Sequence, residues 1–235
     1  MIISVLTSSH LRHKYLVSKL SSNFKKVVYI NENKKPVIRT KKVPLIKKYF
    51  SYVKDAEKKI FKNKIKLKNN VTKINFEYGK INQKKLLNNK FFLKSDLFLV
   101  FGSSIIKGPL LNFLLKNKAL NIHMGVLPYY RGTDCNFWAI HDRNFKKVGA
   151  SLILLSKKID NGKIVQTFVG KIKKNKFLFT MQSCKDAIDA SVNFIKKQKK
   201  TLRTIKIDKK KLIRFSKFKD FNLNALNKFY ITKIS

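Results

Sequence analysis

The chain has 235 residues, of which 44% are hydrophobic and 12% aromatic, and this composition excludes a disordered chain and suits one domain with a sizeable core. It carries 54 Lys and Arg residues against 12 Asp and Glu residues, a formal net charge of +42, which would attract any polyanion. With only Cys135 and Cys184, the sequence has neither a disulfide framework nor a CxxC metal motif, as expected in a reducing compartment.

The N-terminal segment has the pattern of a β-α-β unit. An apolar strand is predicted over 2–6, an amphipathic helix over 11–24 and a second strand over 26–30, and this order favours a parallel sheet. No basic stretch precedes the first apolar run and no cleavage-like site follows it, so we expect no secretory signal. No apolar run approaches the roughly 20 residues that cross a bilayer. We therefore expect a cytoplasmic protein without a membrane partner.

The rest of the chain becomes easier to read after residue 80. Before that point, a lysine-rich helix is expected over 47–66, after Pro44, followed by a loop or a short strand. The later helices are predicted over 81–92, 109–117, 136–143 and 180–199, and the later strands over 95–102, 118–124, 149–155 and 163–170. Pro109 suits the first turn of its helix, and Thr180 is the expected N-cap of the last one.

This alternation of strands and helices predicts the α/β class. We expect a Rossmann-like, open, mostly parallel sheet with helices on both faces, which binds ligands beyond the carboxyl ends of its strands. The main domain is expected over 1–200. A Lys-rich C-terminal extension over 201–235 would pack on the core through its apolar residues. The long helix and the extension also offer apolar surface for a homodimer.

The segment NIHMGVLPYYRG, residues 121–132, places polar side chains at the end of a buried strand. Asn121 and His123 are two residues apart, and side chains alternate between the faces of a strand. Both side chains therefore point the same way, toward the edge where open α/β sheets bind ligands.

This segment resembles the core of the folate-dependent formyltransferases. That family has N-x-H, followed closely by L-P-x-[YW]-[RP]-G and later by an Asp before a Gly-containing turn into a strand. The matching positions here are Asn121, His123, Leu127, Pro128, Tyr130, Arg131, Gly132, Asp160 and Gly162. The resemblance is strong over residues 96–168 and only topological before them.

The resemblance implies transfer of a formyl group from 10-formyltetrahydrofolate to a primary amine, with no metal. The carbonyl oxygen becomes negative in a tetrahedral intermediate, and the Asn121 amide and a His123 imidazolium N–H would donate to it. Asp160 would pair with the histidine and raise its pKa. It would also order a water that carries the amine proton to the leaving nitrogen.

The resemblance also implies two sets of binding residues. The turn 102–107 would hold the pterin ring and the loop 156–160 would close over it, so the expected folate-binding residues are Gly102, Ile105, Ile106, Ser156 and Ile159. The expected substrate-binding residues are Ser8, Arg12, Tyr130 and Arg131. Ser8 and Arg12 stand at a helix start where a phosphate could bind. Arg131 has an alternative role as a structural cation under the loop.

Departures from the family pattern bear on the acceptor. The family often has Ser two residues after the catalytic His, whereas this chain has Gly125, as expected more of the amino-sugar branch. The first loop is not the Gly-rich phosphate loop of the glycinamide ribonucleotide enzymes, and only residues 201–235 follow the core, too few for the added domain of methionyl-tRNA formyltransferases. We expect an anionic small-molecule amine, above all a nucleotide-linked amino sugar. Formylation of glycinamide ribonucleotide or of methionyl-tRNA stays open as an alternative, and so does hydrolysis of formyltetrahydrofolate. No ACT-like regulatory region precedes the core, which counts against the hydrolase.

Two functions of another class also stay open. A basic nucleic-acid-associated protein would explain the charge, but only six of the 54 basic residues are Arg, and abundant Lys, Asn and Ile are also what an AT-rich genome encodes. A metal hydrolase built on His123, His141 and Asp160 lacks an HExxH motif or clustered ligand spacing. Charge alone therefore names no function.

Overall fold

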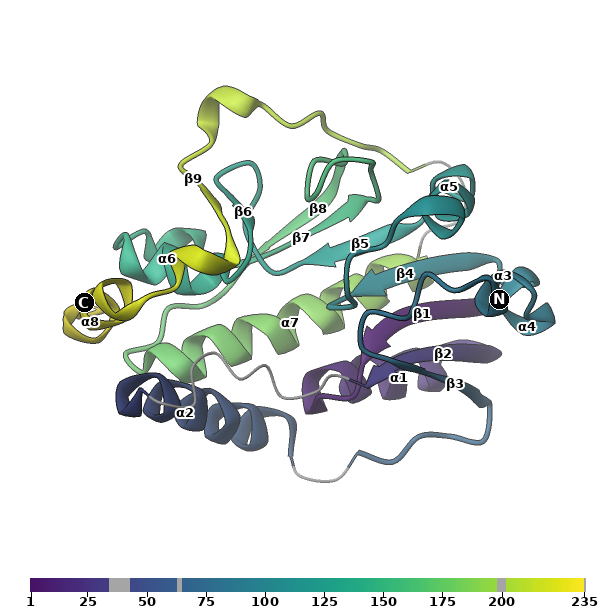
Figure 1. Ribbon diagram of the computed structural model, residues 1–235, viewed down its shortest axis with the longest axis horizontal. Coiled ribbons are helices and arrows are strands. Elements are labelled where there is room, and N and C mark those ends of the chain that lie inside the picture. Colours follow the sequence, from purple (N-terminus) through teal and green to yellow (C-terminus); the bar gives the residue numbers. More distant parts are fainter. Residues whose placement is uncertain (34–42, 63–64, 198–201, 235) are drawn as a thin grey trace.

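The computed structural model describes residues 1–33, 43–62, 65–197 and 202–234. Within them, the centre of the molecule is a seven-stranded sheet in the order β3-β2-β1-β4-β5-β7-β8 (Figure 1). Its strands are β1 (Ile2–Ser8), β2 (Lys26–Asn33), β3 (Val71–Glu77), β4 (Leu97–Phe101), β5 (Leu120–His123), β7 (Gly149–Leu154) and β8 (Ile164–Val169). The first five are parallel, whereas β7 pairs antiparallel with both β5 and β8. The predicted mostly parallel α/β sheet is confirmed.

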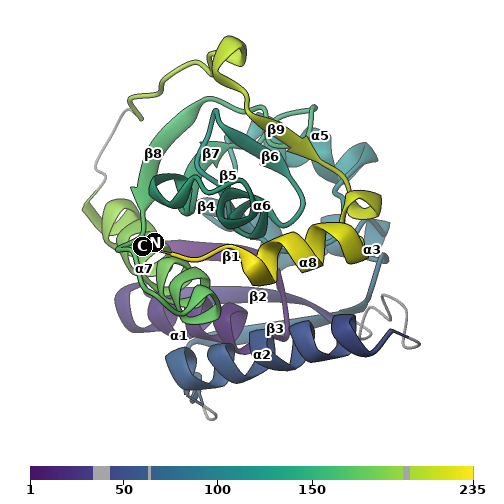
Figure 2. The same ribbon diagram turned by 90° about the vertical axis from the view of Figure 1, so that its left-hand side faces the viewer.

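Helices cover both faces of this sheet (Figures 1 and 2). One face carries α1 (Leu11–Asn23), α2 (Pro44–Phe61) and α7 (Lys176–Lys197), and the other carries α3 (Lys84–Leu87), α4 (Lys90–Leu93) and α5 (Gly108–Lys116). Strand β4 is buried on both sides, since Leu99 and Phe101 pack under the first group and Phe98 and Val100 under the second. In the described part of the chain, no helix combines the length and the apolarity needed to cross a membrane.

Two predicted helices have other boundaries than expected. The helix predicted over 81–92 is two short helices, because the Asn89 side chain accepts hydrogen bonds from the backbone N–H groups of Phe91 and Phe92 and so starts α4. The last long helix begins at Lys176, capped by the Asn175 side chain. Thr180 is therefore not the N-cap: it lies inside α7 and donates to a backbone carbonyl.

The lysine-rich helix predicted over 47–66 is α2, which begins three residues earlier, at Pro44, and ends at Phe61. Proline suits this first position because it has no N–H to leave unpaired there. The short strand expected after it is β3. Residues 63–64 and 198–199 of the predicted helices lie outside the described residues.

The apolar face of α7 packs inside the molecule. Cys184, Ile188 and Val192 are buried in the cluster that α7 forms with the central sheet, α1 and α2. This apolar face is therefore not free to form the predicted dimer surface, and the homodimer itself stays a prediction.

The C-terminal extension is attached beside the 121–132 segment. Strand β9 (Arg214–Ser216) pairs parallel with β6 (Tyr130–Gly132), and α8 (Leu223–Ile231) packs on α6 (Cys135–His141), as Figure 2 shows. The Phe229 ring stacks on Phe137 with 4.7 Å between ring centroids. Short 3-10 turns complete the elements: η1 (Phe145–Lys147), η2 (Lys209–Lys211) and η3 (Phe218–Asp220). Long-range pairing thus places the extension next to the predicted site.

Candidate active site

A cleft of about 630 Å³ opens beyond the carboxyl ends of β1, β4 and β5. Open α/β sheets bind their ligands at this edge. The cleft is lined by 12–13 at the start of α1, 100–106 after β4, 121–124 at the end of β5, 155–160 between β7 and β8, and the segments 132–134 and 215–217. All three predicted catalytic residues, Asn121, His123 and Asp160, line it.

Strand β5 places Asn121 and His123. Leu120 and Ile122 are buried in the cluster under α1 and α7, so the two polar residues between and after them project from the opposite face of the strand. His123 is 6% exposed, and Asn121 is half-buried at the cleft wall. The convergence expected from their spacing is therefore present.

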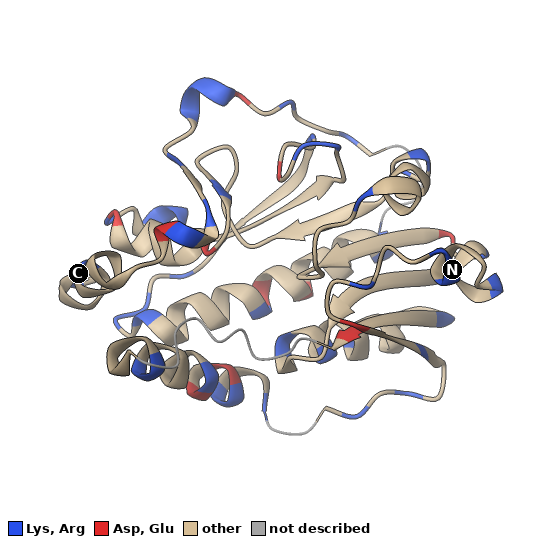
Figure 3. Cartoon of the chain, in the orientation of Figure 1, with Lys and Arg blue, Asp and Glu red and all other residues tan. Residues whose placement is uncertain are grey.

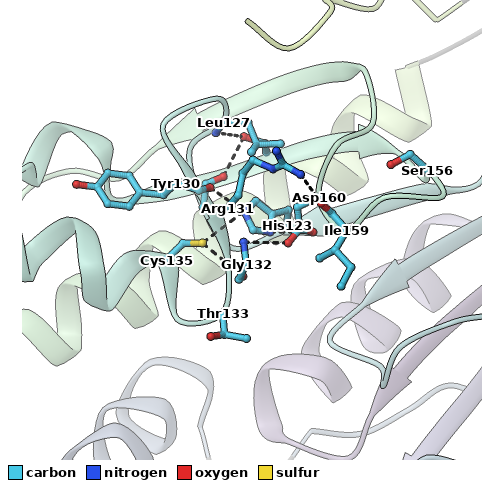
Figure 4. A network of polar contacts seen from close by, with 12 residues as sticks. His123, Leu127, Tyr130, Arg131, Gly132, Thr133, Cys135, Ser156, Ile159 and Asp160 are labelled. Atoms are coloured by element: carbon cyan, nitrogen blue, oxygen red, sulfur yellow. Dashed lines mark hydrogen bonds and ion pairs between the residues drawn. The ribbon is translucent and has the colours of Figure 1, made fainter. Parts of the chain in front are cut away.

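Asp160 reaches His123 from the turn between β7 and β8 (Figure 4). One carboxylate oxygen lies 3.2 Å from His123 Nδ1, and the other accepts the backbone N–H of Gly132 at 3.2 Å. Burial would by itself lower the pKa of His123, but the Cys135 sulfur and the Asp160 carboxylate raise it well above its usual value. Burial likewise works against the charge on Asp160, yet His123 and the Gly132 N–H hold the pKa of this carboxyl below its usual value. The pair is therefore an imidazolium and a carboxylate at neutral pH.

The other ring nitrogen is also engaged by the protein. Nε2 of His123 lies 3.1 Å from the Tyr130 carbonyl oxygen and 3.6 Å from Cys135 Sγ. A direct N–H donation from His123 to a substrate, as predicted, requires the ring to give up one of these contacts. In this arrangement the ring offers a positive charge rather than a free N–H, and Asn121 presents an amide at the open cleft wall.

The local backbone explains how the turn presents Asp160. Its φ of 47° lies in the left-handed region, which Asp tolerates better than most residues. Two residues later, a Cβ at Gly162 would lie 1.6 Å from the Leu154 carbonyl oxygen. The turn thus packs its backbone directly against the end of β7.

The predicted folate-binding residues lie on two sides of the cleft. All five of them, Gly102, Ile105, Ile106, Ser156 and Ile159, are lining residues. The side chains of Ile105 and Ile159 are 68% and 52% exposed, although both are large and apolar. Exposed apolar walls of this kind mark a site for an apolar or flat ligand. Glu32 fixes one wall by accepting the Ser104 N–H at 2.6 Å.

The predicted substrate-binding residues do not all lie at the cleft. Arg12 lines the cleft, where its guanidinium also pairs with Glu57 at 2.7 Å. Ser8 is fully buried and bonded to the His13 ring, so a ligand at this helix start does not meet it. The position of Ser8 does not support its predicted role.

Tyr130 and Arg131 lie behind the cleft wall rather than on it. Tyr130 is 1% exposed, its hydroxyl bonds to Asp142 and Asn144, and burial raises its pKa to about 12. Arg131 donates to the Ile159 carbonyl at 2.8 Å and lies 5.1 Å from the Phe215 ring centroid. Its place fits the structural alternative, a cation under the loop. Neither residue lines the cleft in this structure, and their predicted substrate-binding role stays a prediction.

The structure adds lining residues that the sequence did not indicate. They include Thr133, Asp134, Phe215, Ser216 and Lys217. Figure 4 shows Thr133 outside the network around His123. The last three reach the cleft only because β9 pairs with β6. No local pattern marks them, since nothing near residue 215 shows which distant strand it joins.

The described residues hold no group of three His, Cys, Asp or Glu side chains that could bind a metal ion. His141, which the metal-hydrolase alternative needs beside His123, is held by Asp142 with 2.7 Å from Nδ1 to the carboxylate. The described geometry therefore gives that alternative no ligand cluster.

The fold matches that of solved formyltransferases. A 4-N formyltransferase from Francisella tularensis is 16% identical, with a TM-score of 0.60, and the match covers 98% of this chain and 86% of that one. This chain has the formyltransferase fold. A phosphoribosylglycinamide formyltransferase from Anaplasma phagocytophilum is 14% identical with a TM-score of 0.57, over 83% of this chain and 85% of that one. An N-formyltransferase from Helicobacter canadensis, solved with folinic acid and dTDP-3-aminofucose, is 16% identical with a TM-score of 0.56, over 99% of this chain and 80% of that one.

Comparison of the sequence itself finds no matching family model and no matching curated protein. The formyltransferase fold nevertheless extends well beyond residues 96–168, the part that carries the motifs. The N-terminal strands and helices that resembled the family only in topology are thus part of this fold.

Proposed function

We propose that this protein is an enzyme that transfers the formyl group of 10-formyltetrahydrofolate to a primary amine on an anionic acceptor, with nucleotide-linked amino sugars as the favoured class. The observation that carries the proposal is the charged His123–Asp160 pair beside Asn121 in a cleft of a formyltransferase fold.

The proposed chemistry uses each of these three residues. The acceptor nitrogen bonds to the formyl carbon, and the carbonyl oxygen becomes negative. The Asn121 N–H donates to this oxygen, and the nearby, buried imidazolium stabilises its charge. The bond from carbon to N10 then breaks while a proton moves from the amine to N10, through a water ordered by Asp160. No formal charge has to leave the site.

The cleft walls support a folate as the formyl donor. Ile105 and Ile159 leave exposed apolar surface on both sides of the space next to Asn121 and His123, which suits a flat ring. Folinic acid in the Helicobacter canadensis structure and tetrahydrofolate in a formyltransferase from Anoxybacillus kamchatkensis are compatible with this assignment.

The charges at the cleft support an anionic acceptor. Arg12, Lys157, Lys158 and Lys217 line the cleft, against the carboxylates of Asp134 and Asp160. Phe215, 46% exposed, adds an aromatic surface near Lys217. A phosphate-bearing ring compound would match both features. The sugar nucleotide in the Helicobacter canadensis structure belongs to this chemical class.

Turnover with a panel of amines tests the proposal. The full chain is incubated with 10-formyltetrahydrofolate and glycinamide ribonucleotide, methionyl-tRNA or amino-sugar nucleotides, and release of tetrahydrofolate is followed by absorbance. We expect transfer to one amino-sugar nucleotide. Formate release without an acceptor would instead indicate the hydrolase. Absence of turnover together with no binding of folinic acid in calorimetry would overturn the proposal.

Nucleic-acid binding is the competing function, and the charge is the observation that favours it. Lys and Arg positions follow the chain from end to end (Figure 3), and their excess gives the net charge of +42. Salt-dependent RNA binding is therefore measured beside turnover. Tight RNA binding at physiological salt by a chain without folate binding would replace the enzyme proposal.

Lys217→Gln should raise KM for the anionic acceptor about tenfold, equivalent to about 1.4 kcal/mol. Lys217 lines the cleft from the segment after β9, which carries none of the residues assigned to folate. KM for the folate should change little. Lys219→Gln removes the same charge from a neighbouring exposed position that does not line the cleft, and it serves as the control. An equal effect of both variants would mean that only the overall charge matters.

Asp160→Asn should lower the free energy of unfolding by about 3 kcal/mol near neutral pH, because it leaves the buried His123 charge without its partner. The pKa of Asp160 is lowered, so its stabilisation is lost as pH falls through that lowered value. The pKa of His123 is raised, so its stabilisation is lost as pH rises through that raised value. Urea unfolding across this range should show wild type and variant converging at both ends. A difference that does not vary with pH would contradict the ion pair.

A further inference from the structure

We infer that Cys135 is a positioning residue of this site, which fixes the His123 ring at its Nε2 edge in a space that is open only because residue 125 has no side chain. The effect of Cys135 on catalysis rests on the proposed function, whereas its effect on the position of the His123 ring does not.

The contacts of Cys135 lead to the histidine and not to the cleft. Its sulfur lies 3.6 Å from His123 Nε2 and donates to the Gly132 carbonyl oxygen at 3.5 Å. Cys135 is 2% exposed and is not a lining residue of the cleft. Although Cys135, His123 and Asp160 follow one another like a nucleophile, base and orienting group, a sulfur closed off from the cleft does not reach a substrate. Its effect therefore passes through the ring.

Residues 125 and 135 both border the space beside His123 Nε2. A Cβ on residue 125 would lie 2.6 Å from His123 Nε2, 2.7 Å from the Cys135 Cβ and 3.0 Å from its sulfur. Gly125 is not among the glycines with positive φ, so the backbone does not demand glycine here. The missing side chain makes room for the ring and for Cys135. Residues 125 and 135 should therefore depend on each other.

The charge on His123 should respond to Cys135. The titratable groups that face the ring are Asp160 on the β7–β8 turn and Cys135 on α6, and Arg131 acts on the ring through its effect on Asp160. Both contacting groups raise the pKa of His123 against the effect of burial. Without the thiol, the ring keeps Asp160 and the Tyr130 carbonyl but loses one of the contacts at Nε2. Its pKa should then fall and its position should become less defined.

The chain contains a matched control for the loss of a buried thiol. Cys184 is 3% exposed on α7 and packs in the cluster under the central sheet. Burial raises its pKa to about 12. It is not a lining residue of the cleft and makes no contact with the His123 ring, so Cys184→Ala removes a comparable sulfur away from that ring.

The direct test is the titration of His123 by NMR in the full chain, which has four histidines, with His123→Gln used for assignment. We expect a lower His123 pKa in Cys135→Ala, a smaller decrease in Cys135→Ser, whose hydroxyl replaces the hydrogen bond but not the electrostatic effect of the sulfur, and no change in Cys184→Ala. In turnover, Cys135→Ala should lose about fivefold in kcat, the size of one hydrogen bond, with KM for folate unchanged. Identical titration of wild type and Cys135→Ala would overturn the inference.

A second test uses the shared space. Gly125→Ala should lose more than about tenfold in kcat, since the new methyl group pushes the ring. Combining it with Cys135→Gly, which vacates the space on α6, should restore at least part of that loss. If the loss in kcat of the double variant is the product of the losses of the two single variants, the two positions are independent and the inference is contradicted. If Gly125→Ala does not fold, the two variants are compared by whether they fold. A double variant that also fails to fold counts against the inference.

These readouts separate the two proposals. A wild-type chain that shows no formyl transfer, but whose His123 titration responds to Cys135→Ala, would end the proposed function and support the hold on the ring. A chain that transfers formyl groups, but whose His123 titration does not change in Cys135→Ala, would support the proposed function and overturn the role of Cys135.

Discussion

His123→Ala and Asn121→Ala should each lower kcat/KM for formyl transfer about a hundredfold to a thousandfold, the usual effect of removing one group that stabilises an oxyanion. His123→Ala removes the positive charge that Asp160 maintains, and Asn121→Ala removes the amide donor from the cleft wall. Both interactions strengthen only when the carbonyl oxygen becomes negative. The loss should therefore appear in kcat, with KM for folate changing little.

Steady-state kinetics with a saturating acceptor measures this effect, and calorimetry with folinic acid confirms that each variant still binds a folate. Asn112→Ala, on the exposed side of α5 and outside the cleft lining, controls for the loss of an amide. His123→Ala with more than a tenth of wild-type kcat would show that the ring does not take part in the reaction. The proposed mechanism would then lose its main electrostatic element.

Gly132→Ala should lower the free energy of unfolding by about 3 kcal/mol or more, because it combines an unfavourable backbone conformation with a collision. The φ of Gly132 is 89°, and a Cβ there would lie 2.0 Å from the Ser216 carbonyl oxygen on β9. The pairing of β6 with β9 cannot persist with that atom in place. Phe215 and Lys217 reach the cleft through this pairing, so the variant should lose acceptor binding as well as stability.

Gly79→Ala isolates the backbone part of this effect. Gly79 has a φ of 80°, but a Cβ there meets nothing within 4 Å. Urea unfolding of both variants should show a loss of about 1 kcal/mol for Gly79→Ala and a much larger loss for Gly132→Ala. Equal losses would mean that the extension is held without close contact between β6 and β9.

Local patterns predicted the parts of the fold that depend on near neighbours. The alternation in 118–124 placed Asn121 and His123 on one face, since the orientation of side chains on a strand depends only on their spacing. The β-α-β order at the N-terminus predicted parallel pairing for the same kind of reason. Periodicity failed where Asn89 and Asn175 cap helices, because a single side-chain hydrogen bond decides where a helix starts.

The binding residues show where motif reasoning stops. Tyr130 and Arg131 belong to a motif, and polar residues within a motif suggest contact with substrate. The structure instead buries Tyr130 and turns Arg131 to the Ile159 carbonyl. Whether a polar side chain faces a cleft or a core depends on what packs over it, and residues 214–216 and 223–231 do so here from far along the chain.

The sequence by itself determined the α/β class, the strand that carries Asn121 and His123, and the kind of chemistry that an amide, an imidazole and a carboxylate can perform. The family resemblance also predicted that Asp160 pairs with His123, as it does. Only the tertiary structure decided that Cys135 and the space at Gly125 hold the other edge of the ring, and that Phe215 and Lys217 reach the cleft. The physical reason is the distance along the chain over which each kind of interaction acts. Dihedral preferences and side-chain periodicity act over a few residues, whereas these contacts join segments whose meeting depends on how the whole sheet and its C-terminal extension pack.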